Sequence, residues 1–311
     1  MPWPPRPYSL SLAGTFRNQP PVRFNVWLYK LIGMVQKKYF TEVVLLTKTY
    51  NLQDFKDWLH WHLNIIGFQH AHIFDNESSV DIKSVCDSYG DRVSYELITG
   101  WPNQYALYNR YINNESPAWW VLPIDDDEYL WVSNTFKNNV NNCLYMATHQ
   151  SNDRIKISVG WRNLFPLQYT ENRINEHIVL NSTGWSDNAS NIWQRGNKPV
   201  KTFVLTTATY EWSDRIGHST HDPLVNGKYN PATTIDHKQV NNSWQDTPTD
   251  GNADMILFHY QFRCNSEWVY KCKHRVSAGA KRWDKNHPEL YKQLYNATDI
   301  KLDNRMVKLW H

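Results

Sequence analysis

Cysteine is scarce in this chain, with four in 311 residues, and no two of them form a C-x-x-C pair. This excludes a disulfide scaffold and a zinc ribbon, so we expect reduced thiols. Long apolar runs are missing too: the stretch 24–35 contains Lys30 and is shorter than the ~20 apolar residues that span a bilayer. Residues 1–14 carry Pro and Trp where a secretory signal has a basic start and an apolar run. We therefore expect a cytoplasmic protein with no transmembrane segment, either free or peripheral to a membrane.

An excess of one charge is also lacking. The chain has 33 Lys+Arg against 30 Asp+Glu, a formal net charge of +3, which is too small to indicate a nucleic-acid partner. Aromatic residues, by contrast, make up 14% of the chain and include 16 Trp and 18 Tyr. Rings that combine an apolar face with a polar edge suit flat, hydroxyl-bearing ligands such as sugars.

Apolar runs and helical patterns alternate along the first half of the chain. Strands are predicted at 42–47, 70–75, 92–99 and 118–124, and helices at 51–67, 81–89 and 103–113. The runs are continuously apolar, which is typical of a parallel sheet with helices on both faces. Later strands are predicted at 154–159, 174–180, 201–207 and 255–260, and helices at 266–278 and 288–295. We predict an α/β fold with one large domain, built on a mixed, mainly parallel Rossmann-like sheet.

Four consecutive carboxylates, Asp125 to Glu128, follow the strand 118–124. Ligands bind beyond the carboxyl ends of the strands in such sheets, and packed like charges repel unless a cation compensates them. An extended backbone would place Asp125 and Asp127 on one side, within reach of one metal ion. Oxygen ligands suit Mg²⁺ or Mn²⁺, which keep positions open for phosphate oxygens. A solvated acidic turn is the alternative, and the position at a strand end favours the metal.

These features together resemble the GT-A glycosyltransferases, nearest to the family 2 and family 92 group. The resemblance covers residues 42–273 and lies in the order of five short motifs. They are Asp57-Trp58-Leu59-His60-Trp61-His62, Asp75-Asn76-Glu77-Ser78, Asp125-Asp126-Asp127-Glu128-Tyr129, the Lys201 strand leading to His218, and His259-Tyr260 before the helix from Ser266. Two places depart from the usual pattern: Thr47-Lys48-Thr49-Tyr50-Asn51 stands where an Arg-Asn-Glu-like sequence is usual, and Glu77 stands where Gly is common.

The resemblance implies transfer of a sugar from a nucleotide-diphosphate sugar, with a UDP-sugar favoured, to a glycan or other hydroxyl acceptor. Mn²⁺ or Mg²⁺ would be the cofactor, held by Asp125, Asp127 and a later histidine, with His218 the first choice and His259 the second. Residues expected at the nucleotide sugar are Thr47, Asn51, Asp75, Gln104, Asp125 and Lys201. The chain would divide into an arm (1–40), a nucleotide-binding half (41–132), an acceptor-binding half (133–285) and a helical tail (286–311).

The prediction of an acceptor site is based on tryptophans in the less regular second half of the chain. Asp187 and Asp214 each lie close to a Trp and are the candidates for the base that deprotonates the acceptor hydroxyl. Trp161, Trp185 and Trp212 are the candidate acceptor-stacking residues. The stereochemical outcome and the oligomeric state stay open, and the resemblance implies a bacterial or viral enzyme of glycan biosynthesis.

Two other functions remain. A metal-dependent phosphohydrolase or nuclease would use the same carboxylates, but the sequence shows no second acidic cluster. A non-catalytic carbohydrate-binding protein would account for the tryptophans, but such modules are usually β-sandwiches, which lack strand–helix alternation.

Overall fold

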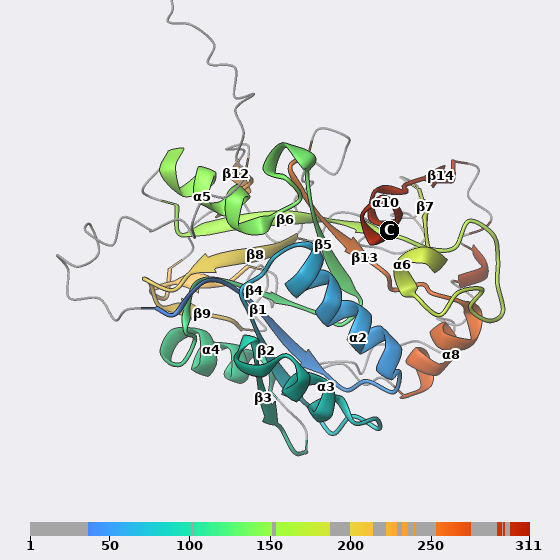
Figure 1. Ribbon diagram of the computed structural model, residues 1–311, viewed down its shortest axis with the longest axis horizontal. Coiled ribbons are helices and arrows are strands. Elements are labelled where there is room, and N and C mark those ends of the chain that lie inside the picture. The colour runs from blue at the N-terminus through green and yellow to red at the C-terminus, as the bar shows by residue number, and fades with distance from the viewer. Residues whose placement is uncertain are drawn as a thin grey trace, which may run out of the picture. The chain divides into compact units, whose positions relative to one another are not determined.

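The computed structural model describes residues 37–100, 103–150, 154–186, 200–213, 222–228, 232–235, 239–240, 253–274, 291–293, 295 and 299–311. They all belong to one compact unit, Lys37–His311. Four parallel strands form one half of the main sheet, in the order β3-β2-β1-β4 (Figure 1). Their bounds are β1 Tyr39–Thr47, β2 His70–Asp75, β3 Val93–Leu97 and β4 Ala118–Ile124.

The other half of the sheet continues from β4 in mixed directions. There β8 (Val200–Leu205) pairs antiparallel with both β4 and β6 (Lys156–Asn163). At the edge, β11 (Ala232–Thr233) and β12 (Gln239–Val240) complete the order β12-β11-β6-β8-β4. A side branch joins β13 (Met255–His259) to β6 in parallel and to β5 (Glu128–Val132) in antiparallel.

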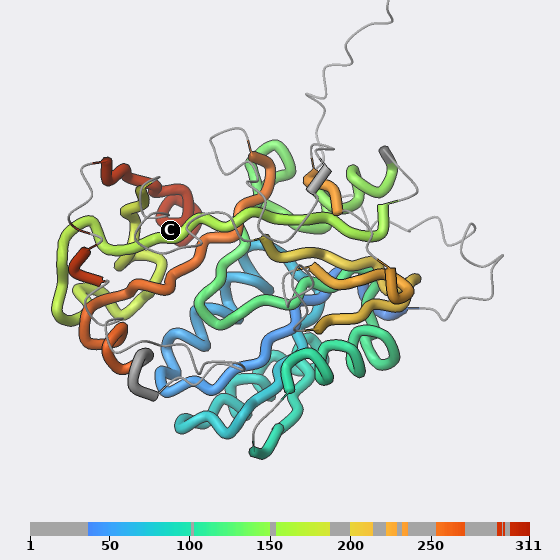
Figure 2. The backbone as a smooth tube through the Cα atoms, turned by 180° about the vertical axis from the view of Figure 1, so that it is seen from behind, coloured from blue at the N-terminus to red at the C-terminus, as the bar shows by residue number. Residues whose placement is uncertain are grey.

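Helices cover both faces of this sheet, as Figures 1 and 2 show from opposite sides. The side chains of β1 alternate between two cores: Val43 and Leu45 belong to the core shared with α2 (Leu52–His60), α3 (Ile82–Ser88) and α5 (Val140–Gln150). Val44 belongs to the second core, shared with α4 (Gln104–Asn114). The predicted α/β class, with a mainly parallel sheet between helices, is confirmed.

Local signals explain where the first helices begin and end. The Asn51 side chain accepts hydrogen bonds from the amides of Gln53 and Asp54 and so caps α2. The helix continues as a π-helical turn, Trp61–Ile65, and the chain leaves it at Gly67, whose φ of 87° lies in the left-handed region that glycine adopts without strain.

Short elements and loops complete the described part of the chain. Further α-helices are α6 (Ile178–Asn181), α8 (Asn265–His274) and α10 (Arg305–Trp310), and 3-10 turns lie at Gly90–Arg92 and Asn134–Phe136. Two small antiparallel pairs join β7 (Gly184–Trp185) to β14 (Lys301–Leu302), and β9 (Tyr210–Glu211) to β10 (Leu224–Val225). No helix among the described residues is long and apolar enough to cross a membrane.

Two local predictions were wrong. The strand predicted at 174–180 is a series of bends followed by α6. Asn181 Oδ1 accepts hydrogen bonds from the amides of Ile174 and Asn175, which folds this segment into a loop, and Ile174 is 80% exposed. The second error concerns Asp125–Asp127, which form a turn in place of an extended segment, because the Glu128 amide donates to the Asp125 carbonyl at 3.1 Å.

Candidate active site

The carboxyl ends of β1, β2 and β4 lie side by side, because these strands are parallel neighbours. Thr47 at the end of β1 is in register with Asp75 at the end of β2. On the other side, Thr47 Oγ1 donates to Asp126 Oδ2 at 2.8 Å, which joins β1 to the turn after β4. The chain runs from β1 out to β3 and returns to β4 on the opposite side of β1. This reversal of strand order is the point at which open α/β sheets bind ligands.

Helix α2 contacts the acidic turn, residues 125–128, through the indole of Trp58. Trp58 Nε1 donates to the carbonyl oxygens of Asp125 at 3.2 Å and of Glu128 at 3.1 Å. The Asp125 amide donates to Glu128 Oε2 at 2.8 Å, so the Glu128 carboxylate folds back onto its own turn. The Tyr260 amide donates to the Asp127 carbonyl at 2.7 Å. The backbone of the acidic turn is therefore fixed by α2 and by the residue after β13.

Lys201, a residue of β8, compensates part of the negative charge of the acidic turn. Its Nζ lies 3.1 Å from Asp125 Oδ2 and 3.4 Å from Glu128 Oε2, and the lysine side chain is 1% exposed. Burial alone would lower the pKa of Lys201, but the charges of Asp125 and Glu128 hold it above its usual value. Burial raises the pKa of Glu128, and the ammonium group opposes this. Lys201 was expected beside a diphosphate; the structure places its ammonium group beneath the acidic turn.

Asp127 faces His259, the last residue of β13, with 3.3 Å between Asp127 Oδ1 and His259 Nε2. His259 Nδ1 lies 2.8 Å from Asn163 Oδ1, an acceptor, so the proton of a neutral imidazole belongs on Nδ1. The Nε2 lone pair of that tautomer then points at a carboxylate oxygen, and two acceptors face each other unless a cation or proton lies between them. In metal-ligating histidines, the ring nitrogen that does not bind the metal typically donates its proton to an oxygen, as His259 Nδ1 does here to Asn163 Oδ1.

These residues fit a divalent cation in part. Among the residues that the structure describes, no group of three or more His, Cys, Asp or Glu side chains is placed to hold a metal ion. The Asp127–His259 pair offers one carboxylate and one imidazole, and Mg²⁺ is commonly bound through one or two carboxylates together with water and substrate phosphates. His218, the first-choice histidine, lies outside the described residues.

The residues predicted for the nucleotide line the same edge of the sheet. Asp75 is 5% exposed, and its carboxylate accepts from the Ser78 amide at 2.8 Å and from the Tyr95 hydroxyl at 2.9 Å. In the turn that the Asp75–Ser78 bond closes, Glu77 has a φ of 55°, in the left-handed region where glycine is favoured.

Two further predicted residues have local structural partners. Asn51 caps α2, as described above. Gln104 begins α4, and its Nε2 donates to the Tyr108 hydroxyl at 3.0 Å. Asn103, not Gln104, caps that helix, through a bond from the Ala106 amide to Asn103 Oδ1.

The predicted acceptor-stacking tryptophans lie in three different places. Trp161 on β6 lies at the acidic turn, with its ring centroid 4.4 Å from that of His259. Trp185 lies between two cations, Arg162 at 4.0 Å and Lys301 at 4.7 Å from its ring centroid. Trp212 is 2% exposed and packs in the core beneath α4, so packing accounts for it. The predicted bases Asp187 and Asp214 lie outside the described residues.

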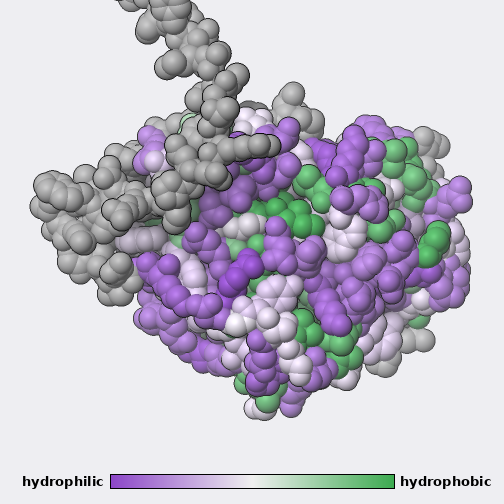
Figure 3. All heavy atoms as spheres, in the orientation of Figure 1, coloured by the Kyte–Doolittle hydropathy of each residue, from purple (hydrophilic) through white to green (hydrophobic). Residues whose placement is uncertain are grey.

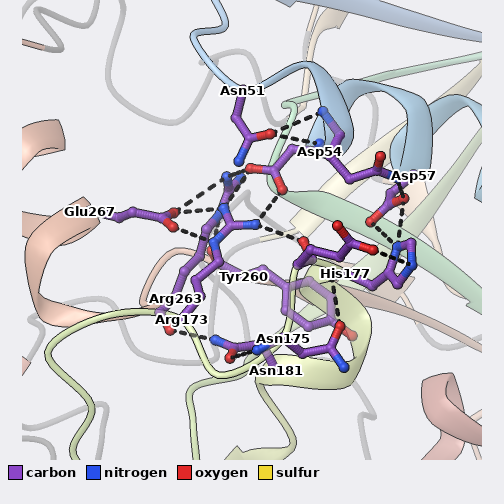
Figure 4. Close-up of polar contacts among 12 residues, drawn as sticks. Asn51, Asp54, Asp57, Arg173, Asn175, His177, Asn181, Tyr260, Arg263 and Glu267 are labelled. Atoms are coloured by element: carbon purple, nitrogen blue, oxygen red, sulfur yellow. Dashed lines mark hydrogen bonds and ion pairs between the residues drawn. The ribbon is translucent and has the colours of Figure 1, made fainter.

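A charge network that the sequence did not indicate lies beside the acidic turn (Figure 4). Asp54 in the first turn of α2 binds Arg173 through both carboxylate oxygens, at 2.5 and 2.6 Å, and also binds Arg263. Glu267 on α8 binds Arg173 through both of its oxygens. The negative charges of Asp54, Glu267, Asp126 and Asp127 raise the pKa of Arg263 against the lowering effect of its burial. The sequence shows Asp54 only as an acidic residue in the first turn of a predicted helix, and its partners come from distant segments.

Comparison with known proteins does not assign the chain to a family. No family model matches it, and no curated protein matches it. Among solved structures, S. aureus TarS 1-349 has a TM-score of 0.29 and 14% identity, over 54% of this chain and 47% of that chain. The same protein in complex with UDP gives a TM-score of 0.27 and 12% identity. The 4-diphosphocytidyl-2C-methyl-D-erythritol synthase from Anaerococcus prevotii gives 0.25 and 10% identity, over 85% of this chain and 86% of that one. This chain spans about half the length of the TarS chain that it matches.

Proposed function

We propose that this chain is a metal-dependent glycosyltransferase that takes a sugar from a nucleotide-diphosphate sugar, with a UDP-sugar favoured, and transfers it to a hydroxyl of a glycan or other acceptor. One observation carries the proposal: the acidic turn meets the end of β1, through the Thr47–Asp126 hydrogen bond, at the reversal of strand order. In such sheets this is the place for a nucleotide.

The roles follow from position along this edge. Thr47, Asn51, Asp75 and Gln104 lie at or just after the ends of β1 and β2 and at the start of α4, and we assign them to the nucleoside side. Asp125 lies at the end of β4, closer to the sugar and diphosphate.

Asp127 and His259 would hold a Mn²⁺ or Mg²⁺ ion, with Asn163 fixing the imidazole orientation. Such an ion supplies Lewis-acid stabilisation to the departing diphosphate. Trp161, whose ring packs on His259, is then the tryptophan placed to stack on a sugar, and Asp187 and Asp214 remain the candidate bases.

A thermal-shift screen tests the binding part of this proposal. UDP, GDP and CMP are each added with Mn²⁺, with Mg²⁺ and with chelator. We expect stabilisation only when a nucleoside diphosphate and a metal are present together, because each completes the site of the other. Asp127→Asn should lose this stabilisation. Asp91→Asn is the matched control, since Asp91 is an exposed acid that pairs with Lys38. Equal shifts with chelator, or full shifts in Asp127→Asn, contradict the proposal.

Product analysis tests the reaction class. Incubation of the protein with UDP-sugars and Mn²⁺ should release UDP. The release should be slow when water accepts the sugar and faster when a suitable acceptor is added. A phosphohydrolase acting at the same carboxylates would release UMP and a sugar phosphate, and this outcome would replace our proposal with that function.

A further inference from the structure

A groove lies on the outer side of α2, away from the acidic turn. It has a volume of about 700 Å³ and runs between α2 and α3, with His177 and Trp310 at one end. Ligand sites commonly have volumes of this order. None of the residues that line it belongs to the acidic turn or to the ends of β1 and β2. Figure 3 shows this face as largely hydrophilic with small hydrophobic areas.

A carboxylate–imidazole pair lies in the groove wall. The Asp57 side chain is 3% exposed, and each of its oxygens lies 3.1 Å from His177 Nδ1. Gln53 Nε2 donates to Asp57 Oδ1 at 2.7 Å. Burial raises the pKa of Asp57. His177 is 30% exposed, so the imidazole is oriented by a buried carboxylate and still open to a ligand (Figure 4).

Aromatic rings stand on both sides of the groove. Trp310 in α10 is half-buried, and its ring centroid lies 5.2 Å from that of His177 and 5.8 Å from that of His60. Tyr89, at the end of α3, lines the other side. Aromatic faces beside hydrogen-bonding side chains match the alternating apolar and hydroxyl surfaces of a pyranose.

We propose that this groove binds a neutral oligosaccharide, as a carbohydrate site separate from the acidic turn. The charges of the lining argue against an anionic ligand: one lysine, Lys56, stands against two acids, Asp57 and Asp81, and Asp57 already faces His177. A phosphate or nucleic-acid ligand would need a surplus of cations. The lining runs along α2 from Leu52 to His60, a rise of about 12 Å at ~1.5 Å per residue, which is longer than one sugar ring. Binding here does not depend on transfer at the acidic turn, so the two proposals can fail separately.

Saturation-transfer NMR tests the site with four probes: maltotetraose, cellotetraose, chitotetraose and a mannotetraose. We expect saturable binding of at least one of them by the full chain. Ser88→Trp fills the groove from α3 without removing a buried contact, because Ser88 is exposed and its hydroxyl donates only to the Val85 carbonyl among its described contacts. This variant and Trp310→Ala should each weaken binding at least tenfold.

Asp87→Trp is the matched control, since Asp87 is a neighbouring exposed residue of α3 that does not line the groove. It should leave oligosaccharide binding unchanged. Asp127→Asn should also leave it unchanged, which separates this site from the acidic turn. The proposal is overturned if none of the four probes binds, or if binding survives in both Ser88→Trp and Trp310→Ala.

Discussion

Lys201 is the buried cation on which the acidic turn depends. Its ammonium group faces Asp125, whose side chain is 37% exposed, and Glu128, whose side chain is 0% exposed. The exposed partner keeps contact with water, whereas the Glu128 carboxylate relies on the Asp125 amide and on Lys201, both of which contact Oε2. Protein charges therefore already offset part of the repulsion that four consecutive carboxylates create.

Lys201→Met should destabilise the protein by about 3–5 kcal/mol, the usual cost of removing one partner from a buried ion pair. The methionine fits the space of the lysine stem but leaves Glu128 without a facing cation. Urea unfolding, followed by tryptophan fluorescence, measures the change in the free energy of unfolding.

Two comparisons sharpen that measurement. Lys201→Met/Glu128→Gln should recover part of the loss, because the glutamine oxygen still accepts the Asp125 amide without a buried charge. Lys38→Met removes an exposed pair with Asp91 and should cost far less than Lys201→Met, because solvent-exposed ion pairs contribute little to stability. If the Lys201 variant costs no more than the Lys38 variant, the compensation described here is wrong.

The residues around the acidic turn show what the sequence could predict at this scale. The position of the turn after a buried strand follows from local pattern, because apolar runs and strand ends are local features. The partners are not local: Lys201 lies 76 residues from Asp125, and His259 comes from another strand. Pattern alone gives no reason to pair them, since pairing depends on which strands become neighbours in the sheet.

At the scale of elements, α2 connects the sheet to the irregular second half of the chain. Trp58 binds the acidic turn from beneath. Asp54 lies on another side of the helix and binds Arg173 and Arg263, whose guanidinium groups also contact Glu267 of α8. The Asp54 side chain is 5% exposed and both arginine side chains are 11–12% exposed. The network therefore holds α2, α8 and the loop before α6 together in a largely dry environment.

Asp54→Asn should loosen this junction, because an amide leaves two buried guanidinium groups with Glu267 as the remaining carboxylate of the network. We expect a loss of about 3 kcal/mol in the free energy of unfolding and faster amide hydrogen exchange in α8, measured by mass spectrometry. Asp81→Asn is the control: Asp81 is an exposed cap of α3 that binds Ser84, and asparagine caps helices about as well. Unchanged exchange in α8 would show that the network does not hold it.

Elements were predictable where one pattern dominates a segment. The strands at 70–75 and 118–124 have the predicted bounds: both end at a polar turn, the second is an uninterrupted apolar run, and the first is buried throughout although it contains His70 and His72. The strand β5 was missed, since it begins at Glu128, the last of the four carboxylates, and pairs with β13, which is distant in the sequence. In the loop before α6, the apolar residues mimic a strand, but Asn181 binds the backbone and bends it.

At the scale of the whole molecule, two buried histidines link stability to pH. His62 Nδ1 lies 2.8 Å from the Trp58 carbonyl, and its Nε2 accepts from the Leu130 amide at 3.2 Å. This neutral tautomer joins α2 to β5, and burial lowers the pKa of His62 to about 3. Burial also lowers the pKa of His72 to about 3, with smaller contributions from His70 and Arg110. Both side chains regain an ordinary pKa of about 6.5 when the chain unfolds.

Between these two values the unfolded chain binds more protons than the folded chain, so stability falls as the pH falls below about 6.5. Each histidine should remove about 2 kcal/mol from the free energy of unfolding between pH ~7 and pH ~5. Urea unfolding across this range measures the slope. His62→Gln keeps a donor for the Trp58 carbonyl and an acceptor for the Leu130 amide but cannot titrate, so it should remove about half of the histidine contribution. His149→Gln, at an exposed histidine of α5, is measured beside it as a control for the substitution itself. An unchanged slope in His62→Gln would mean that His62 already carries its proton in the folded protein, and that the bond to Leu130 is not the one described here.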